Sequence, residues 1–238
     1  MGAHDFLVSS ILGEADRLLK RTDSLKTYLL AALSLSRQDP RRWNFATLEA
    51  RASAVIYTVA ELESLTKYLI RETHKELNGN HQIKDLIPCL RQLAAHEAFE
   101  SLRDLSDATK VWPRRAEATT LDLSGLSLKL PIITKSAQPP MDGKTPNPQL
   151  YARIWDVYGL PGTAFPYARW DASMRKLGGV RNDLAHGNIP FHQVFQSAGM
   201  NSADVERYVD DVTEFALHLV DCWTSYLDQQ MYLVSSGP

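Results

Sequence analysis

The segment NSADVERYVDDVTEFALHLVDCWTSYL, residues 201–227, decides the fold class. Its apolar residues recur at spacings of three and four, the period that places side chains on one face of an α-helix. Asn201 or Ser202 can cap the first turn, and Asp204 stands where the helix dipole favours a negative charge. The apolar stripe comprises Val205, Val209, Val212, Phe215, Leu219, Cys222 and Tyr226. This stretch therefore predicts a long amphipathic helix.

The same period extends over most of the remaining chain. It predicts two long helices near the start, and RQDPRRW (residues 37–43) separates them because Pro40 cannot continue the hydrogen-bond ladder. The turn NGNH, residues 78–81, ends the second helix. The helices predicted before residue 201 cover roughly residues 7–33, 47–77, 82–95, 97–111, 148–158 and 170–186. We therefore expect an all-α bundle of long antiparallel helices in a single domain, residues 1–238.

Residues 119–148 interrupt the helical pattern. In TTLDLSGLSLKLPII, residues 119–133, apolar and polar residues alternate on both sides of Ser124-Gly125, which predicts a small β-hairpin. The following segment, TKSAQPPMDGKTPNP, carries four prolines in residues 134–148 and predicts a loop. We therefore expect a β-hairpin and a loop as an insertion within the helical domain.

The composition is that of an ordinary globular protein, with 44% hydrophobic and 23% charged residues and a net charge of −2. This balance excludes a surface that attracts nucleic acid as a whole, so any such contact is a local patch. Two cysteines are too few for a disulfide framework, and seven scattered histidines show no metal-ligand spacing, so we expect no metal and no other cofactor. No run reaches the length of a membrane span and the first residues do not resemble a signal peptide, which favours a cytoplasmic protein without membrane contact.

The segment GGVRNDLAHGN, residues 178–188, is the strongest candidate for chemistry. Arg181 and His186 form an R-x4-H pair, and Asn182 lies one turn before His186 on the same helical face. The pair Gly178-Gly179 leaves the preceding turn without side-chain bulk, so another helix or a backbone can approach closely. These features predict a polar face that borders a cleft.

Spacing alone does not establish a site, because Arg91 and His96 in RQLAAHE form an R-x4-H pair too. That second pair has no glycine before it and no turn after it. A plain alternative has equal weight on spacing: Arg181 pairs with a carboxylate, and His186 interacts with the dipole at the end of its helix.

The segment RNDLAHGN, residues 181–188, resembles the R-x4-6-H signature of the HEPN superfamily. LYARIWDVYGL, residues 150–160, resembles the equivalent helix of its RiboL-PSP branch. The likeness is specific over about residues 147–230 and is only architectural before them. It implies a metal-independent endoribonuclease, often part of a toxin–antitoxin or anti-phage defence system. It also implies a homodimer in which the motifs of two subunits meet across one cleft.

The resemblance assigns roles to the residues of the motif. His186 is the general acid or base for attack of the ribose 2′-hydroxyl on the adjacent phosphate. Arg181 binds that phosphate and stabilises the charge that develops on its oxygens. Asn182 positions the histidine or the phosphate. Asp183, a further step around the helix, is placed to orient Arg181 or residues of a partner subunit.

Glu63, in ELESLTKYLI, is a further candidate. Helical projection places it at the edge of an apolar stripe, where a carboxylate usually has a partner. The stretch resembles the glutamate-bearing second helix of some HEPN relatives, which implies that Glu63 reaches Arg181 or His186. The alternative, a Glu63–Lys67 pair within the helix, has at least equal weight.

Arg175 and Lys176 precede the motif by one to two turns and are the expected RNA-backbone contacts. The expected partners are an RNA substrate, a second copy of the chain, and an antitoxin or defence-system protein. The alternative function is a non-catalytic HEPN module that binds RNA, a nucleotide or a partner protein.

Overall fold

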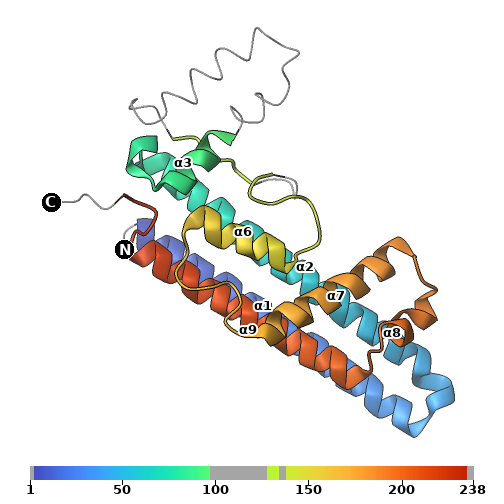
Figure 1. Ribbon diagram of the computed structural model, residues 1–238. Helices are drawn as coiled ribbons and strands as arrows, with labels where there is room; N and C mark the ends of the chain where they lie inside the picture. Colours follow the sequence, from blue (N-terminus) through green and yellow to red (C-terminus); the bar gives the residue numbers. More distant parts are fainter. Residues whose placement is uncertain (1–2, 97–127, 134–137, 235–238) are drawn as a thin grey trace, which may run out of the picture.

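The computed structural model describes residues 3–96, 128–133 and 138–234 (Figure 1). It begins with two long helices, α1 (Ala3–Gln38) and α2 (Pro40–Asn80), which pack against each other. The described part of the chain contains helices and no sheet, so the prediction of an all-α bundle with long antiparallel helices is confirmed. None of the described helices combines the length and the apolar character that crossing a lipid bilayer requires.

A single residue, Asp39, separates α1 from α2. Its side chain accepts a hydrogen bond from the backbone N–H of Arg42 at 3.3 Å, which caps α2. Pro40 takes the first helical position, where its missing N–H leaves no bond unmade. The prediction that α2 starts near residue 47 was therefore wrong: Asp39-Pro40 starts the helix, and the residues assigned to a turn form its first turn.

The third long helix, α9 (Ser202–Asp228), contacts both α1 and α2. The Asn201 side chain accepts a hydrogen bond from the Asp204 N–H at 3.1 Å, and the Asp204 side chain accepts one from the Asn201 N–H at 3.0 Å. The predicted start is therefore confirmed, with Asn201 as the cap. Of the predicted stripe, all residues but the half-buried Cys222 are buried: Val205, Val209, Val212, Phe215, Leu219 and Tyr226.

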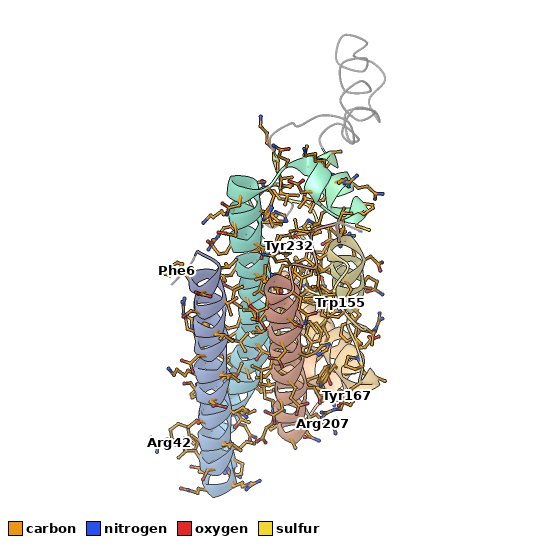
Figure 2. All side chains as sticks on the ribbon, turned by 90° about the vertical axis from the view of Figure 1, so that its left-hand side faces the viewer. Phe6, Arg42, Trp155, Tyr167, Arg207 and Tyr232 are labelled. Atoms are coloured by element: carbon orange, nitrogen blue, oxygen red, sulfur yellow. The ribbon has the colours of Figure 1, made fainter. Side chains whose placement is uncertain are left out.

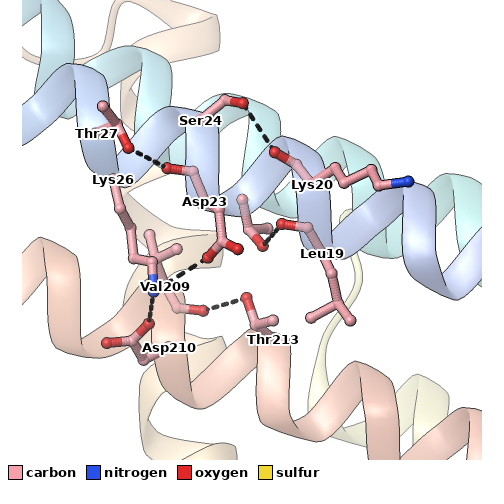
Figure 3. Close-up of polar contacts among 10 residues, drawn as sticks. Leu19, Lys20, Asp23, Ser24, Lys26, Thr27, Val209, Asp210 and Thr213 are labelled. Atoms are coloured by element: carbon pink, nitrogen blue, oxygen red, sulfur yellow. Dashed lines mark hydrogen bonds and ion pairs between the residues drawn. The ribbon is translucent and has the colours of Figure 1, made fainter.

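Polar side chains join α1 to α9 at the rim of this core (Figure 3). The Nζ of Lys26 lies 2.8 Å from Oδ1 of Asp210 on α9 and 3.5 Å from Oδ1 of Asp23 on its own helix. The hydrogen bond to Asp210 raises the pKa of Lys26, against the opposing effect of burial. Because both partners are partly exposed, the pair fixes the position of α9 along α1 more than it stabilises the fold.

The helices α6 (Pro148–Tyr158) and α7 (Ala168–His186) cover the side of the bundle away from α1. In Figure 2, α9 lies between Phe6 of α1 and Trp155 of α6. Asp211 of α9, buried beneath α7, accepts hydrogen bonds from Ser173 Oγ at 2.6 Å and Arg169 Nη1 at 3.0 Å. This buried carboxylate fixes α7, and with it the motif, on α9.

At one end of the bundle the chain is held by contacts between distant segments. The helix predicted over residues 82–95 is divided into a 3-10 turn, η1 (Ile83–Asp85), and α3 (Pro88–Ala94). Between them the Ile87 N–H donates to the Tyr232 carbonyl at 2.9 Å, and the Val234 N–H donates to the Asp85 carbonyl at 2.8 Å. One continuous helix was therefore a wrong prediction, because this pairing with the C-terminal segment requires extended backbone. We call residues 83–96, 128–133 and 231–234 the α3 junction.

Residues 128–133, the end of the predicted hairpin, lie against α2. The Leu130 N–H donates to Asn78 Oδ1 at 2.6 Å, and Asn78 Nδ2 donates to the Leu130 carbonyl at 3.0 Å. These six residues form no strand. The rest of the hairpin and the helix predicted over residues 97–111 lie outside the described residues, so both stay predictions.

A histidine is buried beside this segment. Nδ1 of His74 lies 2.5 Å from the Pro131 carbonyl, and Nε2 lies 2.6 Å from the Tyr158 hydroxyl. Burial lowers the pKa of His74 to about 4. His74 therefore joins α2, α6 and the α3 junction as a neutral imidazole.

The short elements η2 (Phe191–Gln193) and α8 (Val194–Ser197) connect α7 to α9. As predicted, α7 ends just beyond His186, where Gly187 adopts a left-handed φ of 64° and its N–H donates to the Asp183 carbonyl.

Candidate active site

A cleft of about 760 Å³ opens beside the second half of α7. Its walls come from α7, from the loop that precedes α6 with the first two residues of α6, and from one residue of α2. The lining residues are Glu63, Gly143, Lys144, Thr145, Pro146, Asn147, Pro148, Gln149, Met174, Arg175, Gly178, Gly179, Arg181, Asn182 and His186. The structure therefore brings five of the seven predicted site residues to one cleft, from two helices far apart in the sequence.

The two glycines of the motif lie within α7 and border the cleft. A Cβ on Gly178 would lie 3.7 Å from the Pro146 carbonyl oxygen and from Thr145 Cγ2, an ordinary contact distance. A Cβ on Gly179 would meet no described atom within 4 Å. The approach that the sequence predicts at these glycines is therefore made by Thr145 and Pro146 over Gly178, whereas no described atom lies close to Gly179.

The arginine and the asparagine of the motif share one hydrogen-bond network. Asn182 Oδ1 accepts a bond from Thr145 Oγ1 at 2.7 Å and a second, weaker one from Arg181 Nη1 at 3.3 Å. His186 follows Asn182 one turn later and is exposed. Within residues 3–96, 128–133 and 138–234, the His186 ring makes neither a hydrogen bond nor an ion pair. The motif thus presents an imidazole and a guanidinium that can contact a ligand.

Glu63 borders the cleft and also pairs with Lys67 of its own helix, with 2.6 Å between Oε1 and Nζ. The Glu63–Lys67 pair of the second alternative is therefore present, and a contact of Glu63 with Arg181 or His186 stays a prediction. Burial raises the pKa of Tyr151, and the negative charge of Glu63 acts in the same direction, which places the carboxylate near the Tyr151 hydroxyl. That hydroxyl bonds to Thr66 at 2.9 Å, so the wall beneath Glu63 is held by buried polar groups.

Two predicted site residues lie elsewhere. The Asp183 side chain turns to the end of α7, where Asn188 Nδ2 lies 3.5 Å from its Oδ1. Lys176 is not among the residues that line the cleft, whereas its neighbour Arg175 is. Arg175 also pairs with Asp171 in the preceding turn, and this hydrogen bond raises the pKa of Arg175.

The loop before α6 adds residues that the sequence analysis missed, above all Lys144 and Thr145. Lys144 is exposed and gives the cleft a third cation beside Arg175 and Arg181. These three positive side chains outnumber the single lining carboxylate, so the cleft favours an anion although the net charge of the chain is −2. No local pattern marks Lys144 or Thr145, because their role depends on how the loop lies over α7.

No group of three or more His, Cys, Asp and Glu side chains in the described segments is arranged to hold a metal ion. The cleft itself offers one imidazole, one carboxylate, three side-chain amides and three cations.

The fold is thus an all-α bundle, and its anion-favouring cleft lies beside the helix that carries the R-x4-H motif. The profile of the RiboL-PSP-HEPN family matches residues 16–224, and the chain belongs to this family. The match runs from α1 to α9, which extends the family assignment well beyond the segments that suggested it. No curated protein and no solved structure matched the chain.

Proposed function

We propose that the chain is a metal-independent endoribonuclease. The observation that carries the proposal is the single cleft, which gathers His186, Arg181 and Asn182 from α7 with Glu63 from α2 and two further cations. A general base, phosphate-binding cations and a hydrogen-bond donor are what cleavage of RNA at its own 2′-hydroxyl needs. Membership of the RiboL-PSP-HEPN family supports this chemistry.

In the proposed reaction His186 takes the proton of a ribose 2′-hydroxyl. The 2′-oxygen then forms a bond to the adjacent phosphorus, the bond from phosphorus to the 5′-oxygen breaks, and the 5′-oxygen takes up a proton from solvent. The products are a 2′,3′-cyclic phosphate and a 5′-hydroxyl. Arg181 stabilises the charge on the phosphate oxygens during the transfer, since a guanidinium can donate two parallel bonds to phosphate.

The remaining cations extend the proposed site along the strand. Lys144 and Arg175 line the same cleft and are placed to contact phosphates that flank the scissile one. The exposure of His186 at the end of α7 leaves room for a second copy of the chain, and we propose a homodimer. We further propose a role as a toxin or anti-phage effector, held in check or triggered by a partner protein.

One observation favours the second candidate, a non-catalytic module that binds RNA, a nucleotide or a protein. A catalytic histidine is commonly oriented by a third group, and no described residue makes a hydrogen bond to His186. Such a module would form a complex with RNA and would not turn it over.

The test is cleavage of total RNA in the presence of EDTA by the wild type, His186→Ala and His96→Ala, with product ends identified by mass spectrometry. The last variant is the matched control, because it removes the histidine of the other R-x4-H pair. We expect 2′,3′-cyclic phosphate ends from the wild type and the control, and a loss of about a thousandfold in His186→Ala. Equal cleavage by His186→Ala would reject the assignment of the site, and a stable RNA complex without turnover by the wild type would establish the binding module.

A further inference from the structure

The orientation of the Asn182 amide is fixed by its two neighbours. A guanidinium can only donate hydrogen bonds, so the atom of Asn182 that faces Arg181 must be the amide oxygen. The Thr145 hydroxyl contacts the same oxygen at 2.7 Å and therefore donates to it as well. The NH2 group of Asn182 consequently points away from both and, among the described residues, has no hydrogen-bond partner. Because Asn182 lines the cleft, this NH2 group is available to a ligand.

Thr145 is itself held in place by α6. Its carbonyl accepts a hydrogen bond from Asn147 Nδ2 at 3.0 Å, and Asn147 Oδ1 caps α6 by accepting from the Leu150 N–H at 3.0 Å. At the other end of the loop, Arg153 of α6 donates to Asp142 Oδ2 at 2.9 Å. The loop that carries Thr145 is therefore anchored to α6 at both of its ends. This anchoring holds Thr145 against Asn182, as a positioning residue requires.

We propose that Thr145 is a positioning residue that turns the NH2 group of Asn182 toward a phosphate oxygen of the RNA strand. The inference rests on the proposed function of this cleft. Without the Thr145 hydroxyl, only the longer bond from Arg181 holds the amide, and its oxygen can rotate to face the ligand. An amide oxygen repels a phosphate oxygen, whereas an NH2 group donates to it.

The chemistry of the two groups also selects the ligand. The NH2 group of Asn182, and the N–H groups of Arg181 that make no bond among the described residues, can only donate hydrogen bonds. They match a group that only accepts, such as a non-bridging phosphate oxygen, better than the edge of a base, which mixes donors with acceptors. Thr145 therefore acts on recognition of the backbone, and its removal is expected to lower cleavage of all sequences alike.

The experiment measures single-turnover cleavage of a labelled single-stranded RNA dodecamer by six variants, with the maximal rate constant and the enzyme concentration that gives half of it determined separately. Thr145→Val keeps the shape of the side chain and removes the hydroxyl, and we expect cleavage to fall about tenfold. Thr145→Ser keeps the hydroxyl and should stay within about twofold of the wild type. Thr145→Val in an Asn182→Ala background should cause no further loss, because the threonine acts through the asparagine.

Asn182→Asp tests the same idea without touching the loop. The aspartate oxygens can still accept from Thr145 and Arg181, but the NH2 donor is replaced by a negative charge. We expect it to lose at least as much activity as Asn182→Ala. Thr163→Val is the matched control, because this threonine lies in another loop and does not line the cleft.

The outcomes separate this inference from the proposed function. If the wild type cleaves RNA and Thr145→Val cleaves it equally fast, the role of Thr145 is overturned and the nuclease assignment stays intact. The same holds if Asn182→Asp is fully active. If the wild type does not cleave, the affinity of the wild type and the variants for a 2′-O-methyl RNA dodecamer decides whether Thr145 positions Asn182. Equal weakening by Thr145→Val and Asn182→Ala would support the inference, and unchanged affinity in Thr145→Val or no binding by the wild type would overturn it.

Discussion

The α3 junction and the cleft on α7 each contain an R-x4-H pair, yet the two arginines have different partners. Arg91 Nε donates to the Leu86 carbonyl at 2.7 Å, and its Nη2 donates to the Lys84 carbonyl at 2.9 Å. Among the described residues, Arg181 makes one weak bond, to the neighbouring Asn182. In addition α3 ends at Ala94, so His96 does not share a continuous helix with Arg91, whereas Arg181 and His186 both belong to α7.

The same contrast holds for the histidine and glycine of each region. His74, which lies against the α3 junction, is bonded through both ring nitrogens and buried, whereas His186 is exposed. Gly159, beside the junction, has a left-handed φ of 63° and lies close to Ile87, whereas a Cβ on Gly179 at the cleft would meet no described atom within 4 Å. One region uses arginine, histidine and glycine to hold the chain together, and the other leaves the same residue types available to a ligand.

The largest expected effect separates the two arginines. Arg181→Ala should lower RNA cleavage about a thousandfold and leave the free energy of unfolding unchanged, because its side chain stabilises charge on the substrate. Arg91→Ala should lower the free energy of unfolding by about 2 kcal/mol, because two backbone carbonyls lose a charged donor. Urea unfolding and single-turnover cleavage of both variants provide the measurement. A comparable loss of stability in Arg181→Ala would break the comparison.

The second prediction concerns the buried histidine. The pKa of His74 is lowered to about 4, so above pH 6.5 its imidazole is neutral in both the folded and the unfolded chain. As the pH falls from 6.5 to 4, the unfolded chain binds a proton that the folded chain does not, and the fold loses about 3 kcal/mol. We expect urea unfolding to show this loss in the wild type and in His186→Ala, and a smaller one in His74→Gln. Identical pH dependence in all three proteins would contradict it.

The smallest effects distinguish the two glycines. Gly159→Ala should destabilise the fold by about 1–2 kcal/mol, because its φ is left-handed and a Cβ would lie 3.2 Å from Ile87 Cδ1. Gly179→Ala should stabilise it by about 1 kcal/mol, since glycine is unfavourable inside a helix. Thermal unfolding measures both. If Gly179→Ala is more stable and still loses RNA binding, the space at Gly179 belongs to the ligand; destabilisation would show that the glycine serves the fold.

Apolar periodicity and capping residues were enough to predict the long helices, because both signals are local. The start of α2 was missed although its signal, Asp39-Pro40, stands in the sequence. The division of residues 82–95 was missed although Pro88, the first residue of α3, marks it, whereas the hydrogen bonds of this segment to Tyr232 and Val234 could not be predicted. Local patterns carry no information about such partners.

The same limit applies to the candidate site. Arg181, Asn182 and His186 could be identified because one helix spaces them, and Glu63 because of its place on an amphipathic helix. Thr145 could not, since it meets Asn182 only where the Pro-rich loop lies over Gly178. A site assembled from one helix is visible in the sequence, whereas the loop that completes it is not.

The single residue between α1 and α2 bears on when the site can form during synthesis. The contacts between α1 and α2 need only the first 80 residues of the chain, which leave the ribosome first. The α1–α2 pair can therefore dock, with Glu63 in place, while α7 is still being translated. A nascent chain released before α7 would carry the walls that come from α2 and from residues 143–149 without the histidine and the arginine of α7. On the proposed function, such a truncated product could not cut the RNA of the cell that makes it.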